Sequence, residues 1–443
     1  GNASVLTSFA SERVLPWITE VPSQSVAEIA AFDPADPDIA VTEAFAFVDP
    51  AVDGDLGQRI QNVGDIDGDG LDDLVASAFD GAGSPKIAIF YSSTGDLSAP
   101  VIINGPSSSL FGWRIRGGNI DGTAPNDLMI TAPTTDTSDG SGSGGASGGA
   151  VYIWWGANGG IRTDSASDSR LPSIRPDVTI LGEAGEFIGF DAQVADVDAN
   201  DSDDVVFVSR STFGFSGGDR ARFPGAPALF YLDTSAVYTG SPAPLARPDF
   251  IIDPTSVSSG GFLELEAGDY NGDGSGKAEL VVIDRFVDGT NAASGEAYVF
   301  EGGAITGRIT PDIGPPVVAP LLQILRGDGR VNELIGQSHH TMANPSGSGP
   351  DWLILSTVTY DQVYVFSGTD GGLLQDAGTL SPSVSVTDNA FGIALCSNFN
   401  AASGQVDLFV TDTNPAQAAG DPARAFFFEF DGTSLVERSV VTG

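Results

Sequence analysis

Basic residues are scarce in this chain of 443 residues, where 19 Lys and Arg stand against 59 Asp and Glu for a formal net charge of −40. Lysine occurs only at Lys86 and Lys277. Nucleic-acid binding requires a basic face that displaces counterions from phosphates, so nucleic-acid partners are excluded. Anionic membrane surfaces are disfavoured for the same reason. Two interpretations of the acid excess stay open: a hydrated coat that keeps the protein soluble, and a marine or halophilic habitat.

Thiols and imidazoles are also rare. The single cysteine, Cys396, cannot form an internal disulfide, and we expect it to be a small buried apolar residue. The two histidines, His339 and His340, are adjacent. Adjacent residues of a strand point to opposite faces, so we expect polar interior or surface positions rather than a shared metal site.

The sequence lacks the common catalytic motifs. It has no Gly-x-Ser-x-Gly elbow, phosphate-binding loop or His-Glu-x-x-His motif. With so few His and Cys residues, nucleophilic catalysis by a Ser-His or Cys-His pair has little support. Glycosidase or lyase chemistry with paired carboxylates stays open, because acids are abundant and their separation in space is unknown at this stage.

Long apolar runs are absent as well. No segment approaches the ~20 apolar residues of a transmembrane helix, so we expect no direct membrane insertion. No long stretch shows a helical hydrophobic period either. No signal peptide is visible, and we interpret the chain as the mature or trimmed product of a secreted protein, located outside the cell or at its surface.

Acidic residues recur in a fixed loop pattern, which is clearest at residues 64–76. Four carboxylates occupy positions 1, 3, 5 and 9 of this loop; they are Asp65, Asp67, Asp69 and Asp73. Alternate side chains of a tight loop point inward, and Gly70 permits the turn, so these oxygens and the Leu71 carbonyl can converge on one cation. Hard oxygen ligands on a flexible loop suit Ca²⁺. Position 12 is Ala76 rather than the glutamate of an EF-hand, and an apolar strand follows. The pattern therefore predicts a calcium-binding hairpin loop in a β-sheet.

Two further copies of the loop keep most of the oxygen ligands. The copy at residues 196–207 keeps positions 1, 3, 5 and 9, and the copy at 269–283 closes late with a glutamate. The ligands that they predict are Asp196, Asp198, Asn200, Ser202, Asp204, Asp269, Asn271, Asp273 and Glu279. We expect two or three Ca²⁺ sites in all. Whether the weakened copy at residues 119–128 holds metal stays open, while Asp351 and Asp407 keep only an acid before a strand.

An apolar residue and a glycine precede most copies, and an alternating apolar strand follows them. The dipeptides are Leu56–Gly57, Phe111–Gly112, Ile188–Gly189, Ile335–Gly336 and Phe391–Gly392. The strands are residues 87–90, 151–154, 228–231, 297–300, 363–366 and 426–428. This order resembles FG-GAP repeats, which build the β-propeller of integrin α-subunits. The resemblance covers nearly the whole chain, and it implies a propeller with calcium in the blade hairpins.

The repeats span the chain, with junction acids at positions 38, 73, 127, 204, 279, 351 and 407. Repeats of several dozen residues are typical of propellers and solenoids. We predict an all-β fold in which residues 1–443 form one seven-bladed β-propeller, with six blades as the alternative. The first blade, at about residues 1–50, is degenerate and could be closed by the strands at 425–441. Long inserts on the rigid scaffold are the expected binding loops; they are residues 157–177, 209–226, 232–249 and 302–320.

The resemblance implies a non-catalytic, extracellular calcium-binding propeller that acts in adhesion or as a structural subunit of a cell-surface assembly. Its partner would be a protein or glycan at the cell surface, or other chains of the assembly. The tripeptide at residues 326–328, Arg-Gly-Asp, aligns with an ordinary repeat turn at 180–189, and we assign it that role. The alternative is a lectin or a polysaccharide-active enzyme that uses the long-loop face.

Overall fold

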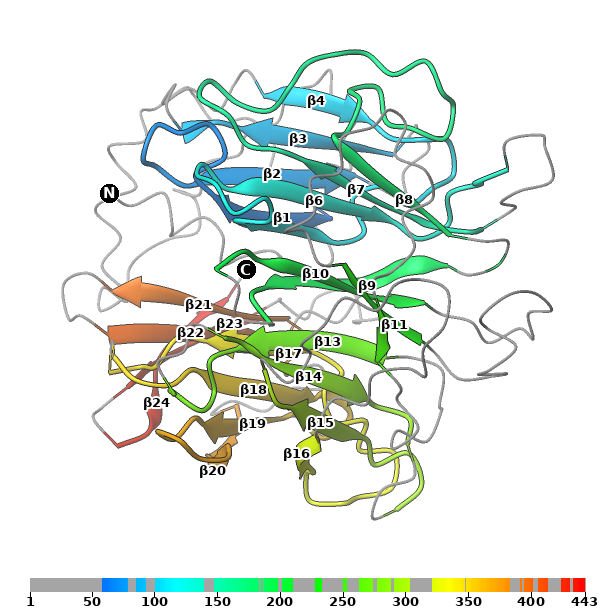
Figure 1. Cartoon of the computed structure of the whole chain (residues 1–443). Coiled ribbons are helices and arrows are strands. Elements are labelled where there is room, and N and C mark those ends of the chain that lie inside the picture. Colours follow the sequence, from blue (N-terminus) through cyan, green and yellow to red (C-terminus); the bar gives the residue numbers. More distant parts are fainter. Residues whose placement is uncertain are drawn as a thin grey trace.

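Short apolar runs form strands throughout the part of the chain that the structure describes, as the computed structural model in Figure 1 shows. The only named helix in this part is a single 3-10 turn at Val358–Tyr360. The described residues are 58–442, apart from 79–84, 93–99, 139–146, 183–184, 186, 198–200, 210–227, 233–249, 253–262, 274–276, 288–290, 303–320, 347, 383–390, 393, 401–404, 413–423 and 431–432.

The described strands form six four-stranded antiparallel sheets, each built from four strands that are consecutive in the sequence. The first strands of the sheets are β1 (Arg59–Gly64), β5 (Ile115–Gly118), β9 (Ile188–Ala195), β13 (Leu263–Gly268), β17 (His339–Met342) and β21 (Ala394–Asn400). The second strands are β2 (Asp73–Ala78), β6 (Asp127–Ala132), β10 (Asp204–Ser209), β14 (Glu279–Asp284), β18 (Trp352–Thr357) and β22 (Gln405–Thr411). The third strands are β3 (Lys86–Phe90), β7 (Ala150–Trp154), β11 (Ala228–Leu232), β15 (Glu296–Phe300), β19 (Gln362–Ser367) and β23 (Arg424–Phe430). The fourth strands are β4 (Val101–Asn104), β8 (Val178–Leu181), β12 (Phe250–Ile252), β16 (Leu321–Leu325), β20 (Gln375–Leu380) and β24 (Leu435–Thr442).

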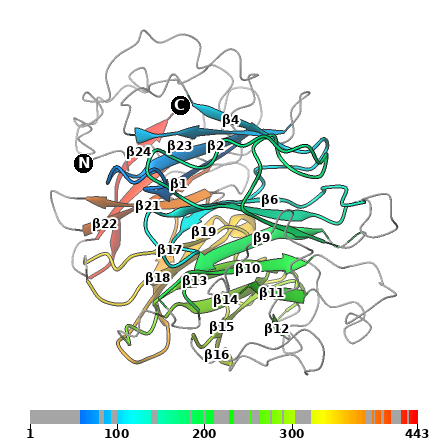
Figure 2. The same ribbon diagram turned by 45° about the horizontal axis from the view of Figure 1, so that its top comes forward.

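The first strands of successive sheets are neighbours in space. β1 contacts β5, β5 contacts β9, and the series continues through β13 and β17 to β21. Figures 1 and 2 show the sheets following one another around the molecule in sequence order. Sheets that meet along their innermost strands, each a simple antiparallel meander, are the blades of a β-propeller. The predicted all-β propeller architecture is therefore confirmed.

The number of blades differs from our expectation of seven, because the described strands form six sheets, the number of the alternative. The strands expected for a first blade lie within residues 1–50, outside the described residues. Its possible closure by residues 425–441 stays a prediction; among the described residues, β23 pairs with β22, and β24 pairs with β23, within the sheet that begins with β21. Phe426 and Phe428 of β23 belong to the core between this sheet and the preceding one.

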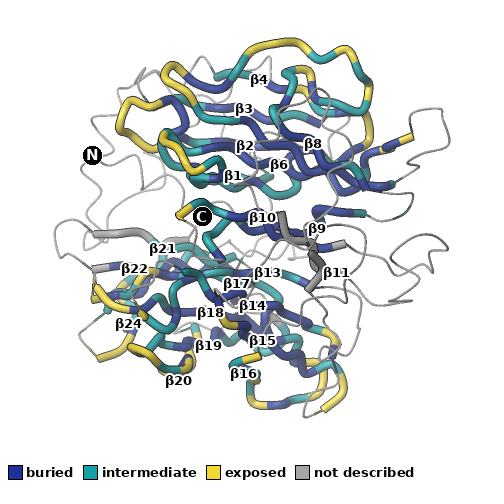
Figure 3. Tube along the Cα trace, in the orientation of Figure 1, coloured by how far each residue is buried: buried dark blue, intermediate teal, exposed yellow. Residues whose placement is uncertain are grey.

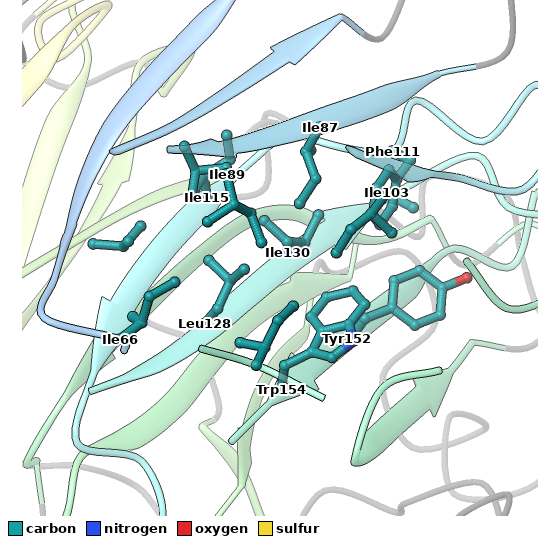
Figure 4. Packing of buried hydrophobic residues seen from close by; sticks show 14 of the residues in the cluster. Ile66, Ile87, Ile89, Ile103, Phe111, Ile115, Leu128, Ile130, Tyr152 and Trp154 are labelled. Carbon is teal, nitrogen blue, oxygen red and sulfur yellow. The ribbon is translucent and has the colours of Figure 1, made fainter. Parts of the chain in front are cut away.

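The hydrophobic core is divided into layers between adjacent sheets. Alternate residues of one strand face opposite neighbours. In β6, Leu128 and Ile130 pack toward the β1–β4 sheet, whereas Met129 packs toward the β9–β12 sheet. Successive residues of β6, β14 and β18 are accordingly all buried, and these strands are dark blue in Figure 3. Figure 4 shows the layer between the first two sheets, where Phe111 lies edge-on to Tyr152 with ring centroids 5.9 Å apart. Each large side chain buried in this way contributes roughly 1.5–3 kcal/mol.

The recurring glycines that precede the first strands bring adjacent blades into close contact. The Gly112 N–H donates to the Thr131 carbonyl of its own sheet at 3.1 Å. Its φ is +93°, and a Cβ there would lie 2.5 Å from the Cβ of Ser77 on the second strand of the preceding sheet. Gly336 repeats the arrangement with a φ of +84° and Ile283 as its neighbour. The glycine is therefore needed both for a left-handed backbone and for blade packing.

Candidate metal centre

The first acidic loop joins β1 to β2 and is organised around Asp65. The Asp65 carboxylate accepts hydrogen bonds from the backbone N–H groups of Gly68 at 2.6 Å, Asp69 at 3.1 Å and Gly70 at 2.9 Å. Gly68 and Gly70 have φ values of +78° and +88°, which let the chain curl around this side chain. The glycine spacing read from the sequence therefore produces a tight loop whose inner wall carries carboxylate oxygens.

Three carboxylates meet inside this loop. One ligand oxygen each from Asp65, Asp67 and Asp73 lies within 4.8 Å of the others, and Asp67 and Asp73 are buried. Asp73 accepts hydrogen bonds from the N–H groups of Ile66 at 3.0 Å and Ser92 at 2.8 Å. Burial raises the pKa of Asp73 to about 6, and the nearby Asp67 charge adds to the effect. Like charges gathered in a low-dielectric site are destabilising unless a cation or protons neutralise them.

These three residues fit a calcium ion better than a transition metal. Ca²⁺ takes carboxylate and carbonyl oxygens at about 2.3–2.6 Å, so its ligand oxygens lie up to about 5 Å apart. The oxygens gathered here meet that requirement. Asp69 and Leu71, the other two predicted ligands, are exposed, and the Asp69 carboxylate instead accepts the Leu71 N–H at 2.7 Å. The structure thus brings together three of the five predicted oxygen donors.

The second loop is described in part. Asp204 accepts the Val197 N–H at 3.0 Å, and Asp196 accepts the Asp201 N–H at 3.1 Å. Ser202 is described and approaches Gly122 of the preceding sheet. Two of its predicted ligands, Asp198 and Asn200, lie outside the described residues. The ligand set predicted for this loop therefore stays a prediction.

The third loop is held by its own hydrogen bonds. Glu279 accepts the N–H groups of Tyr270 at 2.9 Å and Asn271 at 3.2 Å, and the Asn271 side-chain amide at 2.8 Å. Asp269 accepts the Gly272 N–H at 2.7 Å. The Lys277 ammonium lies 3.9 Å from Asp273, where it would compete with a metal ion. Burial raises the pKa of Glu279 to about 7. This loop is a weaker candidate than the first.

The acid that begins the second strand has a structural role that sequence reasoning missed. Asp73, Asp204 and Glu279 each accept the N–H of the second residue of their loop, at 3.0, 3.0 and 2.9 Å. In the weakened loop, Asp127 accepts the Asp121 N–H at 2.9 Å. The repeated acid therefore fixes the hairpin whether or not metal is bound, and its recurrence alone does not count as evidence for a ligand.

A second recurring feature links each loop to the following blade. The carbonyls of Asp65 and Asp67 accept N–H groups from Asn126 and Gly159 of the next sheet, each at 2.8 Å. In the third loop, the Asp269 carbonyl accepts the Asp351 N–H at 2.7 Å, and the Asp351 carboxylate accepts the Asp269 N–H at 3.1 Å. Asp351 therefore joins two blades. In the sheets described above, the junction acid is the first residue of the second strand. In this sheet the first residue of the second strand is Trp352, which pairs with Met342, so Asp351 lies one residue before the position of the junction acid.

The Arg-Gly-Asp tripeptide forms a turn with internal partners, as expected. The Arg326 guanidinium pairs with the buried Glu296 carboxylate at 2.5 Å. The Asp328 N–H donates to Glu333 at 2.9 Å, and the Asp328 carboxylate pairs with Arg330. The arginine of the motif is therefore engaged within the chain.

No protein-family model and no curated protein sequence matches this chain. Among solved structures, the crystal structure of the exotype rhamnogalacturonan lyase YesX is similar with a TM-score of 0.37 and 13% identity, over 86% of this chain and 64% of that chain. A protein from Lactobacillus plantarum is similar with a TM-score of 0.35 and 10% identity, over 82% of this chain and 79% of that chain. This chain thus spans slightly less than two thirds of the length of the lyase. None of the helices in the described part of the chain has the length and apolar character needed to cross a bilayer. The fold assignment rests on the strand order and on the contacts between first strands, and the comparisons add no activity to it.

Proposed function

We propose that this chain is an FG-GAP-type β-propeller that binds calcium in its first acidic loop and serves as a non-catalytic recognition scaffold outside the cell. The observation that carries the proposal is the meeting of Asp65, Asp67 and Asp73 oxygens within 4.8 Å of one another in a glycine-shaped loop. The contacts of Gly112, Gly189, Gly336 and Gly392 with the preceding sheet support the repeat type, because they give the apolar-Gly dipeptide a packing role at these four positions.

Calcium would act in this protein as a structural ion. It would neutralise clustered carboxylates, two of which are buried, and thereby stabilise the hairpin that joins the first and second strands of a blade. The remaining surface would then be available for a protein or glycan partner at the cell surface. A surface with a net charge of −40 favours partners that are basic or that bind through bridging cations.

The test is calorimetric titration of Ca²⁺ into protein that has been stripped with a chelator. We expect Asp67→Asn to weaken binding at the first loop at least about 10-fold, since it removes a buried charged ligand but keeps an oxygen acceptor for the Asp69 N–H. Asp72→Asn is the matched control, because Asp72 is an exposed neighbour outside the carboxylate group. Equal effects of the two substitutions, or no calcium binding by the unmodified chain, would contradict the proposed site.

The non-catalytic part of the proposal needs its own measurement. Calcium-loaded protein incubated with acidic polysaccharides should release no new chain ends and no unsaturated products. Turnover that survives further purification would favour the polysaccharide-active alternative instead.

A further inference from the structure

Polar and charged side chains gather on the innermost strands, although the second strands beside them are apolar. Arg114 lies 2.6 Å from the Asp191 carboxylate, measured from Nε to Oδ1. The Nε of Arg116 donates to the Gln193 side chain at 2.9 Å. We call this group the axial cluster and define it by Arg114, which lies just before β5, and by five residues of β5, β9, β13 and β17: Arg116, Asp191, Glu266, His339 and His340.

The register of the blades places part of this cluster at one level. Gly118, Ala195, Gly268 and Met342 occupy equivalent positions, since each pairs with the first residue of the second strand in its sheet. Two residues before these positions stand Arg116, Gln193, Glu266 and His340. Four successive blades therefore present a polar side chain at the same height where their first strands meet.

The two arginines of the cluster differ in their partners. Arg114 is paired with Asp191, whereas the Arg116 guanidinium donates to a neutral amide and to the Ile115 carbonyl at 3.0 Å. Among the residues that the structure describes, no carboxylate lies within 4.0 Å of Arg116. Arg116 is thus a cation with neutral hydrogen-bond partners, and desolvation lowers its pKa.

A second polar side chain in the cluster, that of His339, has a ring nitrogen without a hydrogen-bond partner. The His339 side chain is only 9% exposed, and its Nδ1 has no hydrogen-bond partner. Its Nε2 lies 3.8 Å from the Asp191 carboxylate. A neutral imidazole can present Nδ1 as an N–H donor. Arg116 and His340 keep partial exposure, while β6 and β18 beside them are buried along their whole length, so solvent reaches the cluster at these residues.

We propose that the axial cluster is a binding site for a small molecule that bears a carboxylate, with the Arg116 guanidinium as its principal contact. A guanidinium matches a carboxylate through two parallel hydrogen bonds. A singly charged carboxylate is favoured over a phosphate dianion, because Asp191 lies in the same cluster. Burial also raises the pKa of Glu266 to about 7, so this acid is largely neutral at mildly acidic pH and repels an anion little there. The site is separate from the calcium loop, and the proposal does not depend on bound metal.

The test uses the unmodified chain, free of any tag, because its only two histidines both lie in the cluster. A ¹H–¹⁵N spectrum of the imidazoles should show two side chains. At pH 6, we expect galacturonate to shift both sets of signals in a saturable way, and neutral galactose to leave them unmoved. Saturable shifts with acetate as well would identify the carboxylate alone as the ligand group, whereas shifts with galacturonate only would assign the site to acidic sugars. Unmoved signals with both acids at tens of millimolar would overturn the proposal.

Substitutions identify the contact residue. Arg116→Gln should weaken galacturonate binding at least 10-fold in calorimetry, and Arg438→Gln should not, because Arg438 pairs with Glu429 at the exposed edge of the last sheet. Unchanged galacturonate affinity in folded Arg116→Gln would refute the role of Arg116. If this variant fails to fold, the imidazole spectrum of the unmodified chain still shows whether the cluster binds a carboxylate. The Asp67→Asn variant separates the two proposals, since we expect it to lose calcium affinity while it keeps the carboxylate-induced shifts.

Discussion

Two buried acids on neighbouring first strands, Asp191 and Glu266, have opposite pKa shifts. Burial disfavours ionisation of both, but the ion pair with Arg114 and the positive charge of the more distant Arg116 hold the pKa of Asp191 below the usual range. Glu266 accepts the Thr341 hydroxyl at 2.9 Å, and burial outweighs the attraction of Arg116, so its pKa rises to about 7. The contacts of each acid, rather than its residue type, therefore set its charge.

The Glu266 shift predicts a pH dependence of stability. Between its ordinary pKa of 4.5 and about 7, the unfolded chain releases the proton while the folded chain keeps it, so the folded state loses stability as the pH rises. Glu266→Gln should remove this loss, which is up to about 3 kcal/mol at 1.36 kcal/mol per pKa unit. We expect the variant to melt higher than the unmodified protein at pH 8 and at the same temperature at pH 4.5, measured by scanning calorimetry at constant calcium. An equal difference at both pH values would show that the pKa of Glu266 is the same in the folded and unfolded states.

At the scale of the strand and turn, the Phe-Gly dipeptide connects one sheet to the next. Gly112 and Gly159 have nearly the same backbone, with φ values of +93° and +92°. Only at Gly112 would an added Cβ meet another atom, the Ser77 Cβ at 2.5 Å, whereas nothing lies within 4 Å at Gly159. The two positions therefore separate the conformational role of glycine from its packing role.

This pair yields a matched substitution experiment. Gly159→Ala should cost about 1–2 kcal/mol through the left-handed backbone alone. Gly112→Ala should cost that amount plus roughly 1–3 kcal/mol for the overpacked contact between blades. Denaturant unfolding followed by near-UV circular dichroism measures both values. Equal losses would indicate that the sheets shift to admit the methyl group, and that the close approach at Gly112 is not required.

Much of the architecture could be predicted from the sequence at this scale, because the alternation of apolar residues in strands and the spacing of acids and glycines in loops are local patterns. The hairpin at Asp65–Asp73 and the buried strands after it need only a short stretch of chain. The pairing of Arg114 with Asp191 could not be predicted, since it joins residues 77 positions apart in different blades. The role of Asp351 was missed for the same reason, as it depends on the register of β17 with β18. The blade count was misjudged because the apolar pattern of residues 425–441 is the same whichever sheet they complete, and they complete the sheet of β21 and β22.

At the scale of the whole molecule, net charge and metal binding both change the free energy of unfolding, because both act on the repulsion between carboxylates. A chain with a net charge of −40 is destabilised by self-repulsion, and the acidic loops concentrate part of that charge. Bound calcium would lower the repulsion locally, and dissolved salt would screen it generally, since the Debye length falls from about 10 Å at 0.1 M to about 3 Å at 1 M.

Chelation should therefore lower the melting temperature by several degrees in dilute buffer, because an ion at 100 times its Kd stabilises the folded state by about 2.7 kcal/mol. Adding about 1 M NaCl should raise the melting temperature of the chelated protein more than that of the calcium-loaded protein. Differential scanning fluorimetry with and without EDTA, at both salt concentrations, gives the four values. If EDTA leaves the melting temperature unchanged in dilute buffer, a stabilising ion is ruled out.

The hydrogen bonds from each acidic loop to the following sheet have a consequence for how ion affinity is distributed. The carbonyls of Asp65 and Asp67 are fixed by Asn126 and Gly159, which belong to another blade. A single excised blade would keep its carboxylates but lose the groups that hold their backbone in place. If calcium binds as proposed, the smallest fragment with full affinity would therefore be a pair of consecutive blades, and loosening of one blade would release the ion from the blade before it.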